Sequence, residues 1–367
     1  MNSSGPAFYR LPDVAETRQW IASVLPTKPE ITGPTKIYST YNSPPDIRVT
    51  ARFQATDQQI DNLVDVVFRA NLFPLLASSA RIHAFLSRHC PGLVPDVLAC
   101  HETDGGTYML YRAFEGEIAS QIRSLDALTA TAQTLAQIQA AVANAPNLEK
   151  ADLPYLPLEQ IPVLFAQMLA NIRERYGRVW AADDGTLTQW MPFAASEVLV
   201  RLEPMQAQIE TWSQELASGP WPVTIVHGDL HTGNAIVQPD GSLLIFDWDD
   251  AVLSHPFLAV ERLIVSAWAL DTGGGPGPWG YVDGTVSQSA VRDAYLNAIN
   301  WGTLEKRERA FDIALCLAVV KEMHHEWNWA ETMGWKDGNP EWTAQLINRL
   351  CQHASRVNLP TDERCGF

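Results

Sequence analysis

Hydrophobic and polar residues follow two different spacings along the chain, and the spacing changes near residue 117. Before that point, short runs of β-branched and aromatic residues alternate with breaks that contain Pro or Asp, which is typical of strands. One run with helical spacing of apolar residues, at residues 75–89, interrupts these strands. The pattern therefore predicts a small antiparallel β-sheet with one helix.

Helical spacing dominates the remainder of the chain. Helices are predicted at residues 125–144, 158–177, 193–218, 257–270 and 308–331. Short apolar runs of strand character lie between the third and fourth of them. Together the two spacings predict an α+β protein, with a β-sheet lobe at residues 1–113 and a larger, mainly helical lobe at residues 114–367.

A β-hairpin is predicted inside the second lobe. Asp240-Gly241 stands between two short apolar runs, and Asp-Gly is among the strongest sequence signals for a hairpin turn. A two-residue turn would pair Pro239 with Ser242. Counted back along both strands, this register would set Asn234 directly opposite Asp247. Because Pro239 cannot donate a hydrogen bond to the ladder, a register shifted by one residue is the alternative.

Several polar side chains are expected at the open end of this hairpin. Asp229 and His231 lie in the loop that leads into its first strand, near Asn234 and Asp247. Carboxylates buried without partners are costly, and Mg²⁺ prefers oxygen ligands from one or two carboxylates. Asn234 and Asp247 are therefore predicted to bind a metal, which leaves Asp229 to orient or deprotonate an attacking hydroxyl. This division of roles indicates phosphoryl transfer.

The same residues carry a family resemblance. The sequence HGDLHTGN, followed by IFDWDDA and SHPF, resembles the aminoglycoside phosphotransferase and choline kinase family, relatives of the protein kinases, and in particular a bacterial subset with the pattern DW-x-DA…SHPF. The resemblance implies a two-lobe, protein-kinase-like fold. Asp229 matches the catalytic Asp of the family, Asn234 its metal-binding Asn, and Asp247 the Asp of the kinase D-F-G. His231 stands where protein kinases carry a Lys near the transferred phosphate, so it is also predicted to take part in catalysis.

In the first lobe the resemblance implies a nucleotide site for ATP or GTP. Arg69 stands where these kinases carry the Lys that binds the α- and β-phosphates, and it is predicted to do the same. Tyr111 and Ala113 resemble the segment that joins the lobes and lines the adenine pocket. The chain departs from the family pattern near residues 78–79, where the helix Glu that pairs with the Lys is missing. It also lacks a glycine-rich phosphate loop, and residues 38–46 with their hydroxyl side chains occupy that region.

Two other functions are compatible with these departures. The first is a kinase-like fold that no longer transfers phosphate, either a pseudokinase or a repurposed binding protein. The second is a metallo-hydrolase, because imidazole and carboxylate ligands suit zinc and iron. Its candidate ligands are His227, Asp229, His231, Asp247 and His255. This second alternative is weaker because HxDxH lacks a second matching His pair.

Composition bears on the acceptor of the phosphoryl group. The chain has 26 Lys and Arg against 42 Asp and Glu, a formal net charge of −16, which disfavours nucleic acid and favours a small cationic ligand. It also has 13 Trp, and a Trp face beside a carboxylate can hold a cation. The acceptors of the family that this chain resembles are often amines or amino sugars, so the resemblance and these features together predict a small hydroxyl-bearing acceptor, such as an amino sugar or amino alcohol. The residues predicted to contact it are Asp250, Trp268, Glu326 and Trp329.

Targeting signals are not evident in the sequence. No stretch approaches the roughly 20 apolar residues of a membrane span, and the N-terminus lacks the pattern of a signal peptide. The five cysteines are odd in number and contain no CxxC pair, which favours reduced thiols. The prediction is a cytoplasmic, Mg²⁺-dependent small-molecule kinase that binds neither nucleic acid nor membrane.

Overall fold

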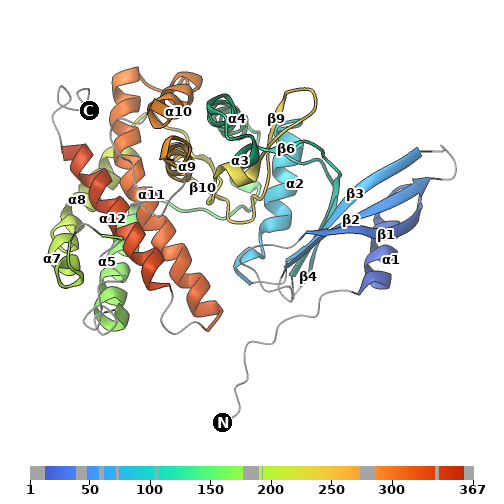
Figure 1. Cartoon of the computed structure of the whole chain (residues 1–367), viewed down its shortest axis with the longest axis horizontal. Coiled ribbons are helices and arrows are strands. Elements are labelled where there is room, and N and C mark those ends of the chain that lie inside the picture. Colours follow the sequence, from blue (N-terminus) through green and yellow to red (C-terminus); the bar gives the residue numbers. More distant parts are fainter. Residues whose placement is uncertain are drawn as a thin grey trace, which may run out of the picture. The chain divides into compact units, whose positions relative to one another are not determined.

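The computed structural model describes residues 13–38, 48–57, 62–71, 74–103, 106–176, 190–191, 193–272, 286–334 and 339–358. The chain forms two units (Figure 1). Unit 1 comprises Met1–Glu117, Asn144–Pro154 and Ala235–Ala251, and unit 2 comprises Ile118–Ala143, Tyr155–Asn234 and Val252–Phe367. Asp247 therefore belongs to unit 1, whereas Asp229 and Asn234 belong to unit 2. The functional lobes at residues 1–113 and 114–367 stay a prediction.

Unit 1 is built on the expected antiparallel sheet. Its strands are β1 (Glu30–Tyr38), β2 (Arg48–Asp57), β3 (Asn62–Asn71), β4 (Val97–Thr103) and β5 (Gly106–Arg112). They lie in the order β1-β2-β3-β5-β4 (Figure 1). The expected helix is α2 (Ser79–His89), and an additional helix, α1 (Val14–Val24), precedes the sheet. Asp13 and Glu16 cap α1 reciprocally, an arrangement that satisfies free N–H groups of its first turn.

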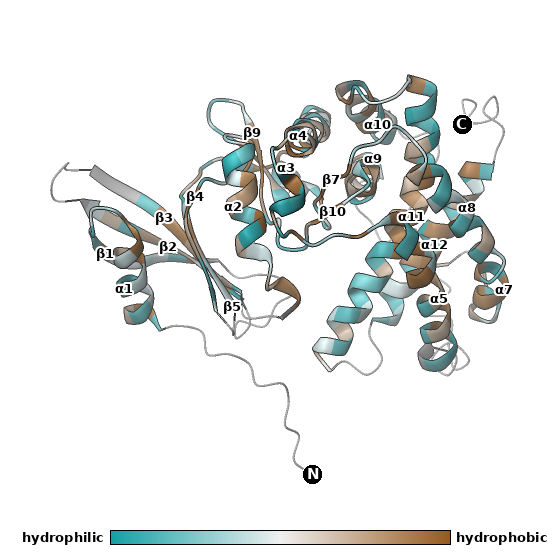
Figure 2. Cartoon of the chain, turned by 180° about the vertical axis from the view of Figure 1, so that it is seen from behind, coloured by the Kyte–Doolittle hydropathy of each residue, from teal (hydrophilic) through white to brown (hydrophobic). Residues whose placement is uncertain are grey.

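Side chains alternate between the two faces of this sheet, and each face packs against a helix. On β3, Phe68 and Ala70 pack in a core with Ile21 of α1. Val67 points the other way and packs with Ala80 of α2. Figure 2 shows the corresponding brown, hydrophobic stretches on the strands.

The predicted hairpin is present in unit 1, but its register differs from the prediction by one residue. It consists of β8 (Ala235–Val237) and β9 (Leu243–Ile245), and β6 (Glu117–Ile118) completes a three-stranded sheet in the order β6-β8-β9. Val237 pairs with Leu243. A two-residue turn would have paired Val237 with Leu244.

The turn itself explains the shift. The N–H of Gly241 donates to the carbonyl of Gln238 at 2.9 Å, and Gly241 has a φ of 85°, so the loop has three residues and closes with a left-handed glycine. The two-residue turn was the basis for setting Asn234 directly opposite Asp247. That register is wrong by one residue.

Unit 2 is mainly helical, as predicted. Its helices are α3 (Ala119–Ile122), α4 (Leu125–Ala143), α5 (Ile161–Asn171), α7 (Val198–Leu202), α8 (Met205–Ala217), α9 (Glu261–Thr272), α10 (Val286–Ala298), α11 (Leu304–Thr332) and α12 (Pro340–Asn358). Two short strands, β7 (Thr224–Val226) and β10 (Val252–Ser254), pair antiparallel. The single helix predicted at residues 193–218 is broken between α7 and α8, at Pro204, because Pro has no N–H for a helix interior.

The helices of unit 2 enclose a core in which α11 is central. This helix of 29 residues packs against α5, α8, α9 and α12. Its buried side includes the charged residues Asp312 and Lys321 as well as apolar side chains. In the described part of the chain, every helix is too short or too polar to cross a membrane.

Candidate active site

The predicted catalytic residue Asp229 lies in the loop that follows β7. The side chain of Gln139, on α4, donates to the carbonyl of Ile225 at 3.1 Å and to that of Pro256 at 2.7 Å. The hydroxyl of Tyr295, on α10, donates to Oε1 of Gln139 at 2.6 Å. All of these groups are buried, so two helices hold the strand from which the loop emerges.

The Asp229 carboxylate is 41% exposed and has two basic neighbours in unit 2. Its Oδ1 lies 2.9 Å from Nη2 of Arg262, and its Oδ2 lies 3.7 Å from Nε2 of His231. Burial would raise the pKa of Asp229, but the positive charge of Arg262, with contributions from His231 and His227, outweighs it and lowers the pKa below its ordinary value. Asp229 is therefore ionised at neutral pH and can accept a hydrogen bond from a hydroxyl.

The same loop brings three predicted residues together. Nδ1 of His231 accepts the N–H of Gly233 at 3.0 Å, which places the ring proton on Nε2, the nitrogen nearer Asp229. The Asn234 side chain is buried, and its Nδ2 donates to the backbone carbonyl of Asp229 at 2.9 Å. This bond orients the amide of Asn234 and leaves its Oδ1 as the oxygen that a metal would need.

A chain of ion pairs leads from Asp229 into the helical core. Nη1 of Arg262 lies 2.9 Å from Oε1 of Glu322, whose Oε2 lies 3.0 Å from Nη2 of Arg349. Arg349 is fully buried, and its Nε donates to Oε1 of Glu261 at 2.8 Å. Sequence reasoning did not identify this chain, which we call the Arg262 network (Asp229, Arg262, Glu322, Arg349, Glu261).

Glu261 is the deepest carboxylate of the Arg262 network. Its Oε1 also contacts Nε2 of His353 at 3.1 Å. Burial would raise the pKa of Glu261, but Arg349 and His353 outweigh it and lower the pKa to about 2. The ring of Trp342 lies 5.1 Å from Cζ of Arg262, within the range of a cation–π contact. The network is thus held by charges and by an aromatic face.

Three of the four predicted acceptor contacts lie on two helices of unit 2, Trp268 on α9 and Glu326 and Trp329 on α11. Burial and the neighbouring Glu322 raise the pKa of Glu326 to about 7. Trp329 is half-buried, and its ring centroid lies 6.2 Å from that of His325. Trp268, on α9, is 6% exposed, so little of its surface is open to a ligand. Contact of these residues with an acceptor stays a prediction.

Asp247, in unit 1, has an unusual backbone conformation. Its φ is 66°, in the left-handed region that residues other than Gly rarely adopt. Asp adopts this region more readily than most residues, and Lys28, Arg123, Asn147 and Asp152 also have positive φ. The side chain is 28% exposed, and the predicted acceptor contact Asp250 follows three residues later, half-buried.

Around Asp247 lies what we call the arginine–aspartate cluster: Arg48, Arg69, His83, Asp247 and Asp249. Nη2 of Arg69 lies 2.6 Å from Oδ1 of Asp247 and also contacts Oδ2 of Asp249. Nη2 of Arg48 lies 2.9 Å from the same oxygen of Asp249, and His83 contacts the other oxygen at 3.1 Å. Arg69 thus pairs with two aspartates, and α2 contains no Glu.

The charges in this cluster balance one another. Burial would raise the pKa of Asp247 and of Asp249, but Arg69 and Arg48 outweigh it, so both pKa values lie below the ordinary value. Burial would lower the pKa of Arg69, but the two carboxylates raise it. Both aspartates are therefore ionised at neutral pH. The repeated Asp in the sequence DWDD was the only signal that could have identified Asp249.

The predicted adenine-binding residues lie where β5 ends. Tyr111 is buried, and its hydroxyl lies 3.0 Å from Sδ of Met109. The N–H of Ala113 donates to the carbonyl of Asp65 at 2.9 Å. A role for both residues in nucleotide binding stays a prediction.

Asn234, in unit 2, and Asp247, in unit 1, each carry an oxygen donor of a kind that binds Mg²⁺. They supply a side-chain amide oxygen and an ionised carboxylate, the oxygen ligands that Mg²⁺ prefers. The metallo-hydrolase hypothesis needs a different set. No group of three or more His, Cys, Asp or Glu placed to hold a metal is found within the described ranges.

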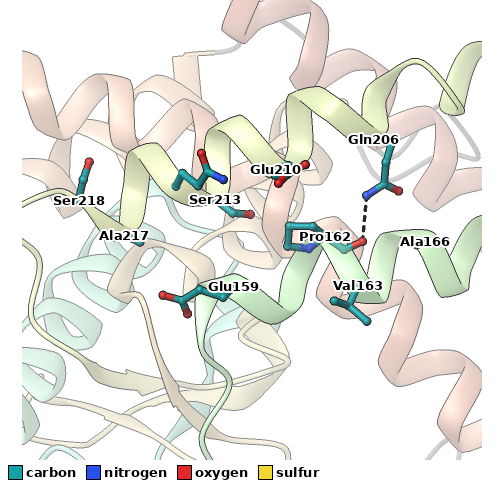
Figure 3. Close-up of a pocket in the computed structure, with 10 residues that line it drawn as sticks. Glu159, Pro162, Val163, Ala166, Gln206, Glu210, Ser213, Ala217 and Ser218 are labelled. Atoms are coloured by element: carbon teal, nitrogen blue, oxygen red, sulfur yellow. Dashed lines mark hydrogen bonds between the residues drawn. The ribbon is translucent and has the colours of Figure 1, made fainter.

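A large groove in unit 2 is lined by none of the predicted residues. It has a volume of about 730 Å³ and lies between α5 and α8 (Figure 3). Gln206 of α8 donates across it to the carbonyl of Pro162 at 3.1 Å.

Ser39, Thr40 and Ser43, expected near the nucleotide phosphates, lie outside the described residues.

Comparison with known proteins agrees with the predicted fold. The macrolide 2′-phosphotransferase of Brachybacterium faecium is 16% identical, with a TM-score of 0.54, over 92% of this chain and 98% of that one. The ethanolamine kinase of Plasmodium vivax is 12% identical, with a TM-score of 0.55, over 90% and 82%. The choline kinase of Cryptosporidium parvum is 10% identical, with a TM-score of 0.56, over 94% and 95%. These structures confirm the two-lobe, kinase-like fold class.

Sequence comparison identifies the family. A search of curated proteins found no significant match. A family model described as the phosphotransferase enzyme family, of which the aminoglycoside phosphotransferases are members, matches residues 50–276, more than half of the chain. The chain belongs to this phosphotransferase enzyme family.

Proposed function

We propose that the protein transfers the γ-phosphoryl group of ATP to a hydroxyl of a small molecule that carries an amino group. The observation that carries this proposal is the state of Asp229. Its carboxylate is ionised and partly exposed, and its backbone is held by Asn234. A fixed, ionised and accessible carboxylate is what a general base for a hydroxyl requires.

In the proposed reaction the acceptor oxygen bonds to the γ-phosphorus as the bond from that phosphorus to the β–γ bridging oxygen breaks. The electron pair of that bond leaves with ADP, and the proton of the hydroxyl passes to Asp229. Because Arg262 lowers the pKa of Asp229, this carboxylate is a weak base that mainly orients the hydroxyl and accepts its proton late. Nε2–H of His231 lies beside the same carboxylate and is proposed to interact with the transferred group.

The nucleotide contacts are proposed for three residues of unit 1. Arg69 is the proposed ligand of the phosphates, and Tyr111 and Ala113 are proposed to line the adenine site. When bound through Asn234 and Asp247, Mg²⁺ would neutralise negative charge on the phosphates.

An amine-bearing acceptor is supported by Glu326. Burial and Glu322 raise its pKa to about 7, so Glu326 ionises at a cost that a bound ammonium group would offset. Trp329, one turn further along α11, could supply an aromatic face to the same cation. Asp250 and Trp268 remain proposed contacts of the acceptor.

The test is ADP release from ATP and Mg²⁺ by the purified protein with a panel of acceptors. Amino sugars and amino alcohols are each compared with a neutral analogue in which a hydroxyl replaces the amine. We expect turnover with an amine-bearing member and a loss of about 10²–10⁴-fold in Asp229→Asn. If the protein binds ATP but no acceptor raises ADP release above the Asp229→Asn level, the non-transferring alternative is the better one.

A further inference from the structure

Two arginines share one face of the sheet in unit 1. The register of β2 and β3 pairs Arg48 with Asn71 and Thr50 with Arg69. Because alternate residues of a strand point to the same side, Arg48 and Arg69 project from the same face. This is the face on which Val67 packs against α2.

Arg48 has a side-chain nitrogen that no described residue satisfies. Its side chain is 9% exposed, and its Nη2 lies 2.9 Å from Oδ2 of Asp249. Its Nη1 is 3.9 Å from Oδ1 of Asp247, beyond hydrogen-bonding distance. Its Nε is buried and has no hydrogen-bond partner among the described residues. A buried donor of a charged group is costly to leave unpaired, which points to an acceptor supplied by a ligand.

The two aspartates of the arginine–aspartate cluster differ in their surroundings. The Asp249 carboxylate is fully buried and has both oxygens engaged, one by His83 and one by the two arginines. The Asp247 carboxylate is 28% exposed. Asp249 therefore holds the guanidinium groups in place, whereas Asp247 is the carboxylate within reach of solvent.

An anion with several oxygens suits this arrangement. Guanidinium groups present N–H donors in a planar fork that matches phosphate oxygens. Two of them side by side fit a ligand with more than one phosphate group. A single carboxylate would leave donors of one arginine unused.

We propose that Arg48 binds the phosphates of the nucleotide together with Arg69, and that Asp249 positions both guanidinium groups. The inference rests on the proposed function in one respect, since it takes the phosphates to be those of the nucleotide substrate. Asp249 then has the role that a Glu on α2 has in the kinases which this chain resembles. Arg69 stands on β3 where these kinases have a Lys, and it then belongs to a site that contains two arginines.

The test is calorimetric binding of ADP, tripolyphosphate and adenosine to the full chain in EDTA, so that no metal contributes. Arg48→Gln removes the charge and the fork. Arg48→Lys keeps the charge alone and serves if the Gln variant does not fold. The matched control is Arg52→Gln, because Arg52 is on the same strand and its Nη2 contacts Asp65 at 2.5 Å and Glu115 at 3.1 Å instead. Thermal melting checks each variant before titration.

We expect Arg48→Gln to lower the affinity for ADP and for tripolyphosphate by about 10-fold to 100-fold, which is the effect of losing a hydrogen bond to a charged group. Arg48→Lys should weaken them less, and adenosine affinity should not change. Arg52→Gln should bind all three like the wild type.

Two results would overturn the inference and leave the proposed function standing. The first is that Arg48→Gln binds ADP with the affinity of the wild type. The second is that Arg48→Gln loses affinity for ADP and for adenosine equally, which would indicate a general structural effect. A wild-type protein that binds neither ADP nor tripolyphosphate in EDTA would overturn the inference, and one that also fails to bind ATP in the presence of Mg²⁺ would overturn the proposed function as well.

Discussion

Replacement of Glu261 by Gln tests whether the Arg262 network stabilises unit 2. Glu261 is 1% exposed and makes its contacts with Arg349 and His353. Glutamine keeps the shape of the side chain but removes the negative charge. Arg349, itself fully buried, would then keep Glu322 as its one ionic partner among the described residues.

The magnitude follows from the pKa of Glu261. Its ordinary value is 4.5, and in the folded protein it is about 2. A depression of this size corresponds to about 3 kcal/mol of stability at neutral pH. Removal of one partner from a buried ion pair typically costs about 3–5 kcal/mol, which agrees. We therefore expect Glu261→Gln to lose about 3 kcal/mol at pH 7.

The pH dependence has a definite sign. Because the folded pKa is below the unfolded one, the stabilisation is complete above about pH 4.5 and is lost as the pH falls toward 2. The difference between the wild type and Glu261→Gln should therefore shrink with acidification below pH 4.5. A difference that stayed constant down to pH 2.5 would contradict the assignment of the effect to this charge.

Urea unfolding followed by Trp fluorescence is the assay. The control is Glu197→Gln, which removes an exposed partner of Arg201, 2.8 Å away and one helical turn along the chain. Pairs of this kind contribute about 0.5 kcal/mol or less. Equal shifts of the unfolding midpoint in the two variants at pH 7 would refute a stabilising role of the network.

Three further outcomes are expected. Arg262→Gln should lower kcat and move the acid limb of the pH–rate profile to higher pH, because Arg262 lowers the pKa of Asp229. An unchanged profile would show that this ion pair has no influence on the reaction. Asp247→Asn should abolish the dependence of ATP binding on Mg²⁺, and Asn is a suitable replacement because it also tolerates positive φ. A dependence that persists in calorimetry would exclude Asp247 as a ligand of Mg²⁺. Glu326→Gln should raise the midpoint of thermal unfolding at pH 8 but not at pH 4, because the raised pKa makes ionisation of Glu326 unfavourable in the folded state. An unchanged midpoint at pH 8 would contradict the raised pKa.

The parts that sequence predicted correctly depend on local pattern. Helix and strand spacing predicted the α+β organisation, and Asp-Gly predicted the hairpin. The register failed by one residue because a left-handed conformation at Gly241 adds a residue to the turn. The break at Pro204 could have been predicted, since Pro in a helix interior is a known interruption.

The parts that sequence missed depend on contacts between distant segments. Arg262 lies 33 positions beyond Asp229, and Arg69 lies 180 positions before Asp249. A long arginine side chain can reach any carboxylate that the fold brings near, so spacing along the chain carries no information about the pair. Glu322 shows the same limit. It is charged and lies on a helix, which usually indicates a solvated face, yet its side chain is 12% exposed.

The arginine–aspartate cluster also bears on the choice between a transferring and a non-transferring protein. Burial of charged groups costs free energy, and apolar side chains of similar volume often give equal or greater stability. Val67 and Met109 fill neighbouring positions of unit 1 in that way. The cluster instead keeps Asp247 at positive φ and Arg48 with a buried nitrogen that has no partner among the described residues. Both features lower stability in the absence of a ligand, which supports the proposed nucleotide site over a purely structural role of the cluster.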